Sequence, residues 1–368
     1  MVLLKQKRAT SAFQLIDTRT IGTALASKLV PARKQPMSDR LPLKVLITGG
    51  HETGGVSSFA EALCSGFADL GIDARVIAPG RVLGCLGELR DPRVLKILSL
   101  SAIFAAPLAR RAICVAHGFP RADAQGWIKT LGIAGSFSVA NRSSRLVAVS
   151  HYVATHLRAI FNLRVDAVIH NPLNHAFFNA ASNHWRERDT IVFAGRLHPV
   201  KGLDRILPAL LATVRESPCL RAVIAGDGVL RPMVEALVAQ EPRIKLAGLL
   251  PHAELRRLLS RARVFVSGCE TEALGISYLE ALSQGCAVVM PACAGGLEIA
   301  PEEIGKAIHL FSGTGHEPMV NALRRALQSE PPGVDLRSYA PRAVAEAYLN
   351  LDARFFPVHM KLAVVPHA

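Results

Sequence analysis

The sequence predicts an α/β protein made of two domains, each built on a doubly wound parallel sheet. The chain has 368 residues, which is more than one ordinary hydrophobic core accommodates. From residue 43 onward, short apolar runs alternate with amphipathic segments, as in β-α repeats. A polar stretch at residues 171–189 interrupts this alternation, and we interpret it as the linker between the domains.

The first domain is expected to begin with a strand over residues 43–48 and a glycine-rich loop over 49–55. A helix over 57–70 has apolar residues at three- and four-residue spacing and is followed by Gly71, a common helix stop. A strand over 74–78 completes a β-α-β unit, which implies parallel pairing. Residues 81–112 are expected to be helical. Further strands are predicted at 112–117, 146–150 and 168–169, with a helix between 150 and 161.

The second domain repeats the same rhythm more regularly. Strands are predicted at 190–194, 221–225, 243–247, 263–267 and 286–290, and helices at 202–216, 229–240, 252–261 and 275–284. We therefore divide the chain into a basic tail (1–40), an N-terminal domain (41–180), a C-terminal domain (181–338) and a C-terminal helix with a tail (339–368). That helix, over about 341–354, could complete the second domain or cross back to the first.

The formal net charge of +14 restricts the partners of the chain. Eight Lys and Arg residues fall within residues 1–40, against only Asp17 and Asp39. No basic segment interleaved with aromatic residues and no zinc-finger spacing is present, which argues against nucleic acid. The surplus instead suits phosphorylated small molecules or an anionic membrane surface. The tail itself fits either a loosely ordered basic segment or a transit peptide.

Membrane spans and disulfides are not expected. The longest apolar stretch runs from Ile97 to Leu108, which is about half the ~20 residues needed to cross a bilayer. The seven cysteines are odd in number and form no Cys-x-x-Cys pair, so neither a disulfide framework nor a structural zinc site is predicted. We expect a cytoplasmic protein that is peripheral on the inner face of the membrane.

Charged residues lie where strands of the second domain are predicted to end, which is where open parallel sheets bind ligands. Arg196 and Lys201 follow the strand at 190–194, and near a helix N-terminus they would form a clamp for a pyrophosphate group. Glu272 lies in the loop after the strand at 263–267, and Glu280 lies in the next helix among apolar neighbours. Such a setting seldom holds a charge without a partner. Two carboxylates would also suit a glycosidase.

Two further candidates come from the first domain. Gly54 and Gly55 at a helix start would let the backbone approach a phosphate or an acceptor closely. The loop is neither a Walker A motif nor a dinucleotide G-x-G-x-x-G motif. His117 ends a predicted strand before a glycine; a lone histidine is more often structural, but this position faces the expected cleft. We find no metal-ligand cluster and no G-x-S-x-G elbow.

Several of these segments match the landmarks of one enzyme family in the expected order and spacing. They are Glu272-Ala-Leu-Gly-Ile-Ser-Tyr-Leu-Glu280, which has the E-x7-E pattern, Gly295-Gly-Leu-Glu298, Gly195-Arg-Leu with Lys201-Gly, Ala225-Gly-Asp-Gly228, Val149-Ser150 and Ala116-His-Gly-Phe. In this combination the chain resembles the family 4 retaining glycosyltransferases over about residues 43–300. The resemblance implies the GT-B fold, in which two Rossmann-like domains face a deep cleft. Asn171-Pro-Leu-Asn174 stands where the family often has Asn-Gly-Val-Asp. This difference concerns the geometry of the hinge between the domains more than the chemistry.

The resemblance also implies roles for individual residues. Arg196 and Lys201 would bind the donor pyrophosphate and stabilise the leaving group without a metal or cofactor. Glu280 would hold the ribose, and Glu272 would hold the transferred sugar. His117 would contact that sugar near the reacting carbon, and Gly54 and Gly55 would lie near the phosphates or the acceptor. Backbone contacts with the donor would come from Ala273, Leu274, Gly275 and Ile276.

The predicted function is therefore transfer of a sugar from a nucleotide-diphosphate-sugar to an acceptor hydroxyl, with retention of configuration. The acceptor would be a saccharide or a lipid-linked group in cell-surface polysaccharide or glycolipid biosynthesis. Two alternatives stay open. Another GT-B enzyme, such as a sugar-nucleotide epimerase, would need no acceptor. A non-catalytic module that binds nucleotide-sugars or membranes would explain the basic tail.

Overall fold

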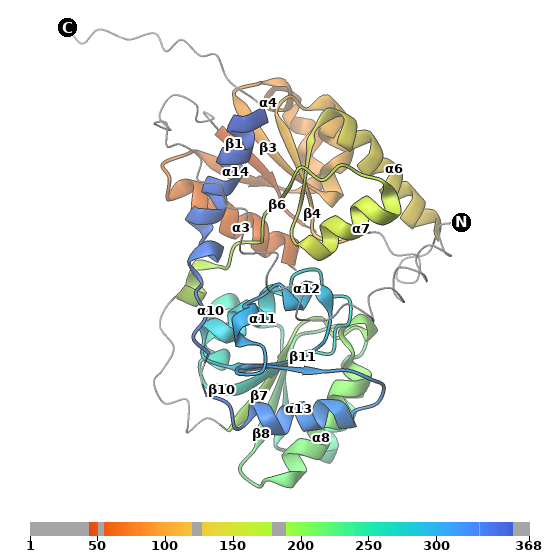
Figure 1. The fold of residues 1–368 in the computed structure, drawn as a ribbon, viewed down its shortest axis with the longest axis vertical. Helices are drawn as coiled ribbons and strands as arrows, with labels where there is room; N and C mark the ends of the chain where they lie inside the picture. Colours follow the sequence, from red (N-terminus) through yellow and green to blue (C-terminus); the bar gives the residue numbers. More distant parts are fainter. Residues whose placement is uncertain (1–43, 51–54, 120–126, 179–188, 331, 356–368) are drawn as a thin grey trace, which may run out of the picture.

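A computed structural model describes residues 44–50, 55–119, 127–178, 189–330 and 332–355. These residues form two α/β domains stacked along the long axis of the molecule (Figure 1). Each domain has a parallel sheet of six strands. The predicted α/β class with two doubly wound parallel sheets is confirmed. The basic tail 1–40 lies outside the described residues.

The N-terminal sheet has the strand order β2-β1-β3-β4-β5-β6. Its central strands are buried hydrophobic segments, as expected when helices cover both faces. The prediction that residues 81–112 are helical was wrong in one respect, because residues 94–99 form a central strand between β1 and β4. The strands are β1 (Lys44–Thr48), β2 (Ala74–Ile77), β3 (Val94–Ser99), β4 (Ala112–Ala116), β5 (Arg145–Ala148) and β6 (Ala167–Val168).

The helices of this domain connect successive parallel strands. The longest of them, α6, was not predicted from the sequence. Two of the short 3-10 helices, η3 and η4, pack against each other and against α4 at the outer side of the sheet. The helical elements are α3 (Gly55–Ala68), η3 (Pro79–Cys85), α4 (Leu86–Arg90), η4 (Leu100–Leu108), α6 (Trp127–Ser143), α7 (His151–Phe161) and η5 (His175–Phe178).

The C-terminal sheet has the order β12-β11-β10-β7-β8-β9. The first strand of the domain, β7, therefore lies in the middle, with β8 on one side and β10 on the other. The sequence predicted five of these strands to within a residue or two and missed the edge strand β12. The strands are β7 (Thr190–Ala194), β8 (Arg221–Ala225), β9 (Ile244–Gly248), β10 (Ala262–Val266), β11 (Ala287–Pro291) and β12 (Ile308–Phe311).

Helices cover both faces of this second sheet. Helices α8 and α13 pack together on one face, and α10 and α11 lie on the other, toward the N-terminal domain. Helix α13 was not predicted. The helical elements are η7 (Pro199–Lys201), α8 (Leu203–Glu216), α9 (Arg231–Gln240), α10 (His252–Leu259), α11 (Ile276–Ser283), α12 (Ala294–Leu297), η8 (Pro301–Glu303), α13 (Glu317–Ala326) and η9 (Arg337–Tyr339).

The last helix, α14 (Pro341–Phe355), leaves the C-terminal domain and packs against α3 of the N-terminal domain (Figure 1). A buried ion pair between Arg111 and Asp352 holds it there, with Arg111 Nε donating to Asp352 Oδ1 at 2.8 Å. Among the described residues, the segments around Leu173 and around Tyr339 both pass between the domains. They touch each other, because the Leu173 amide donates to the Tyr339 carbonyl at 2.8 Å. The domains are thus connected by two adjacent segments.

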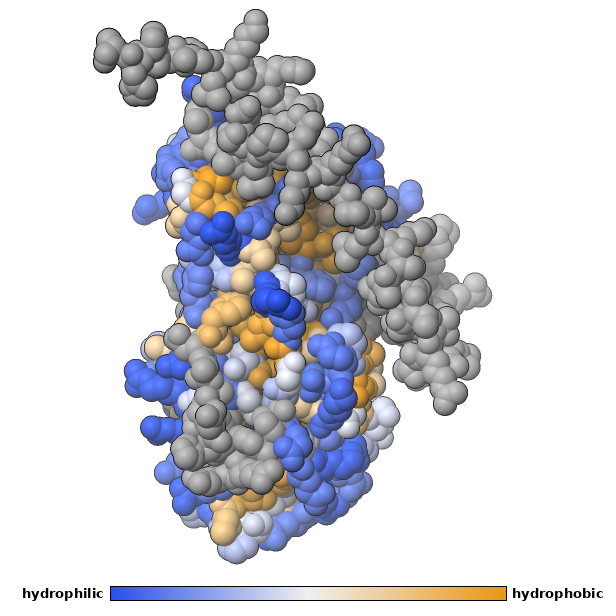
Figure 2. Space-filling view, turned by 60° about the vertical axis from the view of Figure 1, so that its left-hand side comes forward, coloured by the Kyte–Doolittle hydropathy of each residue, from blue (hydrophilic) through white to orange (hydrophobic). Residues whose placement is uncertain are grey.

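On the face shown in Figure 2, most of the coloured surface is hydrophilic, with separate hydrophobic patches in both domains. Buried apolar side chains of the N-terminal domain form a cluster that continues into α11 and β10 of the C-terminal domain. A second cluster is confined to the C-terminal domain, between its sheet and α8 and α13. The two domains therefore share apolar contacts in addition to the linker.

The Arg111–Asp352 pair gives a test of how α14 is anchored. We expect Asp352→Asn to lower the free energy of unfolding by about 3–5 kcal/mol, because it leaves the Arg111 guanidinium buried without its counter-charge. Chemical denaturation of both proteins measures this difference. Asp335→Asn is the control, since it removes the exposed partner of Arg337 and is expected to leave the free energy of unfolding nearly unchanged. Equal losses in the two variants would contradict the anchoring role.

Candidate functional site

The candidate site lies where the strand order of the C-terminal sheet reverses. From β7 the chain proceeds to β8 and β9 on one side, and it then returns to add β10 on the other. The loops that leave the adjacent strands β7 and β10 start side by side there, at the carboxyl edge of the sheet, where open α/β sheets bind ligands. One loop carries Arg196 and Lys201, and the other carries Glu272.

Two glycines bring these loops into contact. Gly202 has φ +70°, and a Cβ atom built on it would overlap the backbone of Gly268. A Cβ on Gly268 would in turn lie 2.8 Å from the Gly202 carbonyl oxygen. Side chains at either position would force the loops apart. The backbone contact therefore fixes the distance between the cations of one loop and the acid of the other.

Lys201 and Glu272 form an ion pair across this contact. Lys201 Nζ donates to Glu272 Oε2 at 2.8 Å, and both side chains are largely buried. Burial by itself lowers the pKa of Lys201, but the carboxylate of Glu272 outweighs burial and the net shift is upward. Arg196 is exposed and lies close enough to Lys201 to oppose this shift. Three of the four predicted catalytic residues are thus close together.

The segment that follows Glu272 offers backbone groups, rather than side chains, to a ligand. Leu274 is buried and cannot offer its side chain to a ligand. Gly275 has φ +80° and caps the N-terminus of α11, where the first amides of the helix are unpaired. Ser150 of the N-terminal domain donates to the Ala273 carbonyl at 2.6 Å. This arrangement is consistent with the predicted backbone contacts of Ala273 to Ile276.

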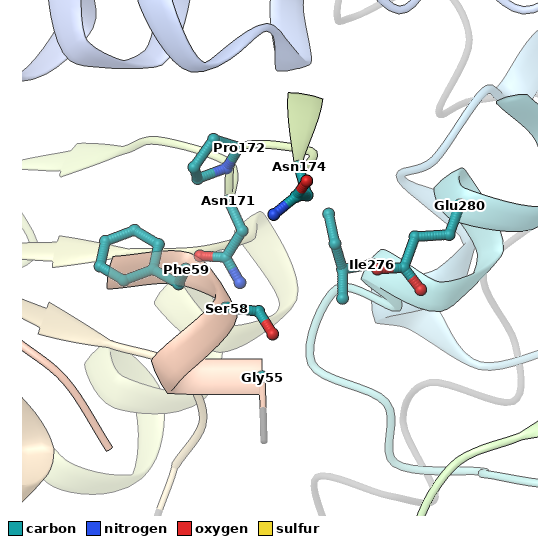
Figure 3. A pocket seen from close by; sticks show the side chains of 8 residues that line it. All are labelled: Gly55, Ser58, Phe59, Asn171, Pro172, Asn174, Ile276 and Glu280. Carbon is teal, nitrogen blue, oxygen red and sulfur yellow. The ribbon is translucent and has the colours of Figure 1, made fainter. Parts of the chain in front are cut away.

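Glu280 and Ile276 line a pocket between the domains. Figure 3 shows them on one side, with side chains from α3 and from residues 171–174 on the other. Glu280 has no charged or hydrogen-bonding partner for its carboxyl group among the described residues, and burial raises its pKa to about 8. Near neutral pH this carboxyl group is therefore mostly protonated. The pocket is lined by Gly55, Ser58, Phe59, Asn171, Pro172, Asn174, Ile276 and Glu280.

His117 lies next to two residues of this pocket, Phe59 and Asn171. Its ring contacts Phe59 edge-on at 4.5 Å between centroids, and both ring nitrogens are enclosed without a hydrogen-bond partner among the described residues. Burial lowers the pKa of His117 to about 4, although the nearby Asn171 side chain opposes this shift. The Asn171 Oδ1 atom is likewise enclosed, and no described residue bonds it. His117 is therefore a neutral imidazole at physiological pH.

The glycine-rich loop is described only in part. Gly55 begins α3 and lines the pocket, whereas Gly54 lies outside the described residues. The sequence did not single out Ser58 or Phe59 of α3 as site residues, and it assigned Asn171 and Asn174 to the linker. The departure of 171–174 from the family pattern was a signal that could have drawn attention to these asparagines.

The described residues offer neither a metal cluster nor a membrane span. In the ranges that the structure describes, no group of three or more His, Cys, Asp and Glu side chains is placed to hold a metal ion. None of the described helices is both long enough and apolar enough to span a bilayer.

Residues 188–329, which contain Arg196, Lys201, Glu272 and Glu280, match the family model for glycosyl transferases group 1. This match spans most of the C-terminal domain. The resemblance drawn from the sequence motifs is thereby confirmed.

The gpi3 subunit of phosphatidylinositol N-acetylglucosaminyltransferase from Schizosaccharomyces pombe is 30% identical over 168 residues, which are 44% of this chain and 37% of the yeast protein. Sulfoquinovosyl transferase SQD2 of Arabidopsis thaliana is 31% identical over 185 residues, or 50% of this chain and 35% of SQD2. The chain thus matches little more than a third of the length of these glycosyltransferase relatives.

Solved structures show the same fold over most of the chain. The structure of Anabaena HepE in complex with UDP and glucose has a TM-score of 0.61 and 17% identity, and the match covers 85% of this chain and 95% of HepE. WaaG, a glycosyltransferase involved in lipopolysaccharide biosynthesis, has a TM-score of 0.60 and 16% identity over 86% of this chain and 95% of WaaG. The predicted GT-B fold is confirmed.

The buried Glu280 of the C-terminal domain predicts a specific pH dependence of stability. Its pKa is about 8 in the folded chain against an ordinary value of 4.5, so between these pH values the folded protein binds a proton that the unfolded chain releases. The contribution of Glu280 to the free energy of unfolding should therefore fall as pH rises from about 5 to 8, by up to about 1.4 kcal/mol per pH unit. Glu280→Gln should remove this slope.

Urea denaturation at several pH values measures the effect. Glu302→Gln serves as the control, because Glu302 is an exposed carboxylate in the same domain. Parallel pH profiles for wild type and Glu280→Gln would show that Glu280 is ionised in the folded protein.

Proposed function

We propose that the chain transfers a sugar from a nucleotide-diphosphate-sugar to an acceptor hydroxyl and retains the anomeric configuration. The observation that carries this proposal is the convergence of Arg196, Lys201 and Glu272 at the point where the strand order reverses. Glu280 lies in the interdomain pocket, on the helix that follows Glu272. The match of residues 188–329 to the family model for glycosyl transferases group 1 supports the reaction type.

The two cations account for the departure of the nucleotide diphosphate. As the bond between the anomeric carbon and the phosphate oxygen breaks, negative charge develops on the diphosphate, and Arg196 and Lys201 stabilise it. Lys201 is suited to this role because Glu272 keeps it charged in a partly buried site. Such preorganised charge stabilisation is a large contribution to catalysis. We propose that the two cations make a bound metal unnecessary.

The remaining residues hold the donor. Glu272 accepts hydrogen bonds from hydroxyls of the transferred sugar while it holds Lys201. Glu280, when protonated, both donates to and accepts from the ribose hydroxyls, which explains why a buried acid without a partner is tolerated. The enclosed nitrogens of the neutral His117 are free to bond a sugar hydroxyl on entry of the donor.

Retention of configuration follows if the acceptor attacks from the face that the diphosphate leaves. In that step the acceptor oxygen bonds to the anomeric carbon as the carbon–phosphate-oxygen bond breaks, and the acceptor proton passes to the departing phosphate. No carboxylate is needed as a nucleophile. The N-terminal domain supplies the acceptor side of the cleft. The functions that the relatives' names state support a lipid-linked or saccharide acceptor in glycolipid or polysaccharide synthesis.

Donor binding and turnover test the proposal. A thermal-shift screen with UDP, GDP, ADP and their sugars should identify a stabilising nucleotide by mass action. With that donor, Lys201→Met should lower kcat by about 100- to 1,000-fold, because one leaving-group cation is lost. Glu280→Ala should abolish stabilisation by the nucleotide. EDTA should leave wild-type activity unchanged.

Lys306→Met is the matched control, since Lys306 is an exposed lysine of the same domain. It should keep both binding and activity. Release of free nucleotide and sugar at an undiminished rate without any acceptor would favour an epimerase-type reaction. If none of the nucleotides raised the melting temperature of the protein, the proposed donor site would be contradicted.

We also propose that the enzyme is peripheral at an anionic membrane. Exposed apolar side chains on η3, α4 and η4 support this: Leu83 is 49% exposed, Phe104 51% and Leu108 42%. Beside them, Arg90 and Arg110 line a groove of about 420 Å³ and form no ion pair with any described residue. Figure 1 places α4 at the end of the N-terminal domain that is farthest from the C-terminal domain. Apolar side chains flanked by free cations suit anionic lipid, where each cation adds roughly 1 kcal/mol.

Flotation with vesicles containing anionic phosphatidylserine or only neutral phosphatidylcholine tests this surface. Arg90→Glu with Arg110→Glu should reduce binding to anionic vesicles at least tenfold. The charge-matched control, Arg257→Glu with Arg261→Glu in the C-terminal domain, should bind like wild type. Deletion of residues 1–40 measures the separate contribution of the basic tail. Loss of binding only on deletion of the tail would contradict a role for η3, α4 and η4.

A further inference from the structure

The N-terminus of α7 is completed by a residue of the other domain. Ser150 caps the helix and accepts from the Val153 amide at 3.1 Å. The two preceding amides have no partner within the helix and instead donate to Glu298 of the C-terminal domain. The His151 amide lies 2.7 Å from Glu298 Oε2, and the Tyr152 amide lies 2.6 Å from Oε1. A carboxylate suits a helix N-terminus because it satisfies free amides and opposes the helix dipole.

Residues 272–278, which we propose to bind the sugar donor, are called the donor segment below. Glu298 is held beside this segment by the glycines that precede it. Gly295 lies so close to the backbone of that segment that a Cβ atom on it would be 2.6 Å from the Ala273 carbonyl oxygen. A Cβ on Gly296 would be 3.1 Å from the Tyr278 ring. The glycines therefore pack α12 onto the segment 272–278, and Glu298 extends from the end of α12 to α7. Figure 1 shows α12 at the side of the C-terminal domain that faces α7.

A second hydrogen bond joins the same three elements. Ser150 Oγ donates to the Ala273 carbonyl at 2.6 Å while it caps α7. Ser150 is completely buried, and Ala273 is half-buried, so the bond is largely shielded from water. The donor segment is thus held on one side by Gly295 of its own domain and on the other by Ser150 of the N-terminal domain.

We propose that Ser150 and Glu298 are positioning residues that couple donor binding to closure of the domains. Their hydrogen bonds cross the cleft, so they exist only when the domains are together. When formed, they fix the backbone of Ala273, next to Glu272 and at the start of α11. A nucleotide-sugar bound to that segment therefore favours the closed state, and closure in turn aligns the segment for the donor. We call the hydrogen bonds of Ser150 and Glu298 across the cleft the latch. The identity of the ligand rests on the proposed function, but the existence of the latch does not.

Hydrogen–deuterium exchange of the free protein tests the latch without any substrate. Glu298→Gln removes the acceptor of at least one amide, so exchange at His151 and Tyr152 should accelerate about tenfold. Ser150→Ala should accelerate exchange at Val153, and Ser150→Thr should restore protection because it keeps the hydroxyl group. Glu302→Gln, an exposed carboxylate of the same domain, should leave all three amides unchanged. Unchanged exchange in Glu298→Gln would overturn the proposal.

UDP binding and small-angle scattering test the coupling. In wild type, UDP should reduce the radius of gyration, and in Glu298→Gln and Ser150→Ala it should bind about tenfold more weakly and cause less compaction. Where activity is measurable, KM for the nucleotide-sugar should rise more than kcat falls. A purely structural role would lower the melting temperature without changing the affinity for UDP, and that result would also overturn the proposal. If wild type binds no UDP, the UDP-donor assignment fails while the exchange experiment still decides on the latch.

Discussion

The structure depends on the backbone contact between Gly202 and Gly268 at the point where the C-terminal sheet reverses its strand order. Adjacent parallel strands bring two loops to one edge, but ordinary side chains there would hold the loops apart. With glycine on both sides, Lys201 of one loop reaches Glu272 of the other at 2.8 Å. The ion pair then keeps the lysine charged in a partly buried position. The pair of cations that we propose to bind the diphosphate is thus positioned by the sheet topology together with glycine at two positions.

A second constraint acts between the domains. Within the described residues the chain passes between the domains at residues 171–174 and at 339–340, and these two segments are hydrogen-bonded to each other. Beyond this connection, the domains meet through Ser150, Glu298 and a shared cluster of apolar side chains. The pocket that contains Glu280 is therefore formed jointly by α3, the first crossing and α11. The shape of such a pocket changes whenever the domains move relative to each other. The hydrogen bonds that hold the two domains together therefore affect the chemistry of the site.

Much of the fold followed from periodicity, and the exceptions have physical reasons. The strands of the C-terminal domain are short apolar runs bounded by turn residues, so five were located from the sequence. Strand β3 was missed because it runs directly into the apolar η4, and a continuous apolar run does not distinguish a strand from a buried helix. Lys96 within it is fully buried and bonds the Asp91 and Arg110 carbonyls, which no local pattern indicates. Helix α6 was missed because it has no clear apolar stripe.

The sequence by itself determined the α/β class and the two-domain division, and it singled out the residues of the proposed diphosphate site, because these depend on periodicity and on motifs at strand ends. Only the tertiary structure decided what surrounds them. It placed Asn171 and Phe59 across a pocket from Glu280, packed α14 on the N-terminal domain, and joined Glu298 to α7. These contacts link residues more than a hundred positions apart. Their partners are set by how the domains and chain crossings pack in three dimensions, and that packing leaves no local pattern in the sequence.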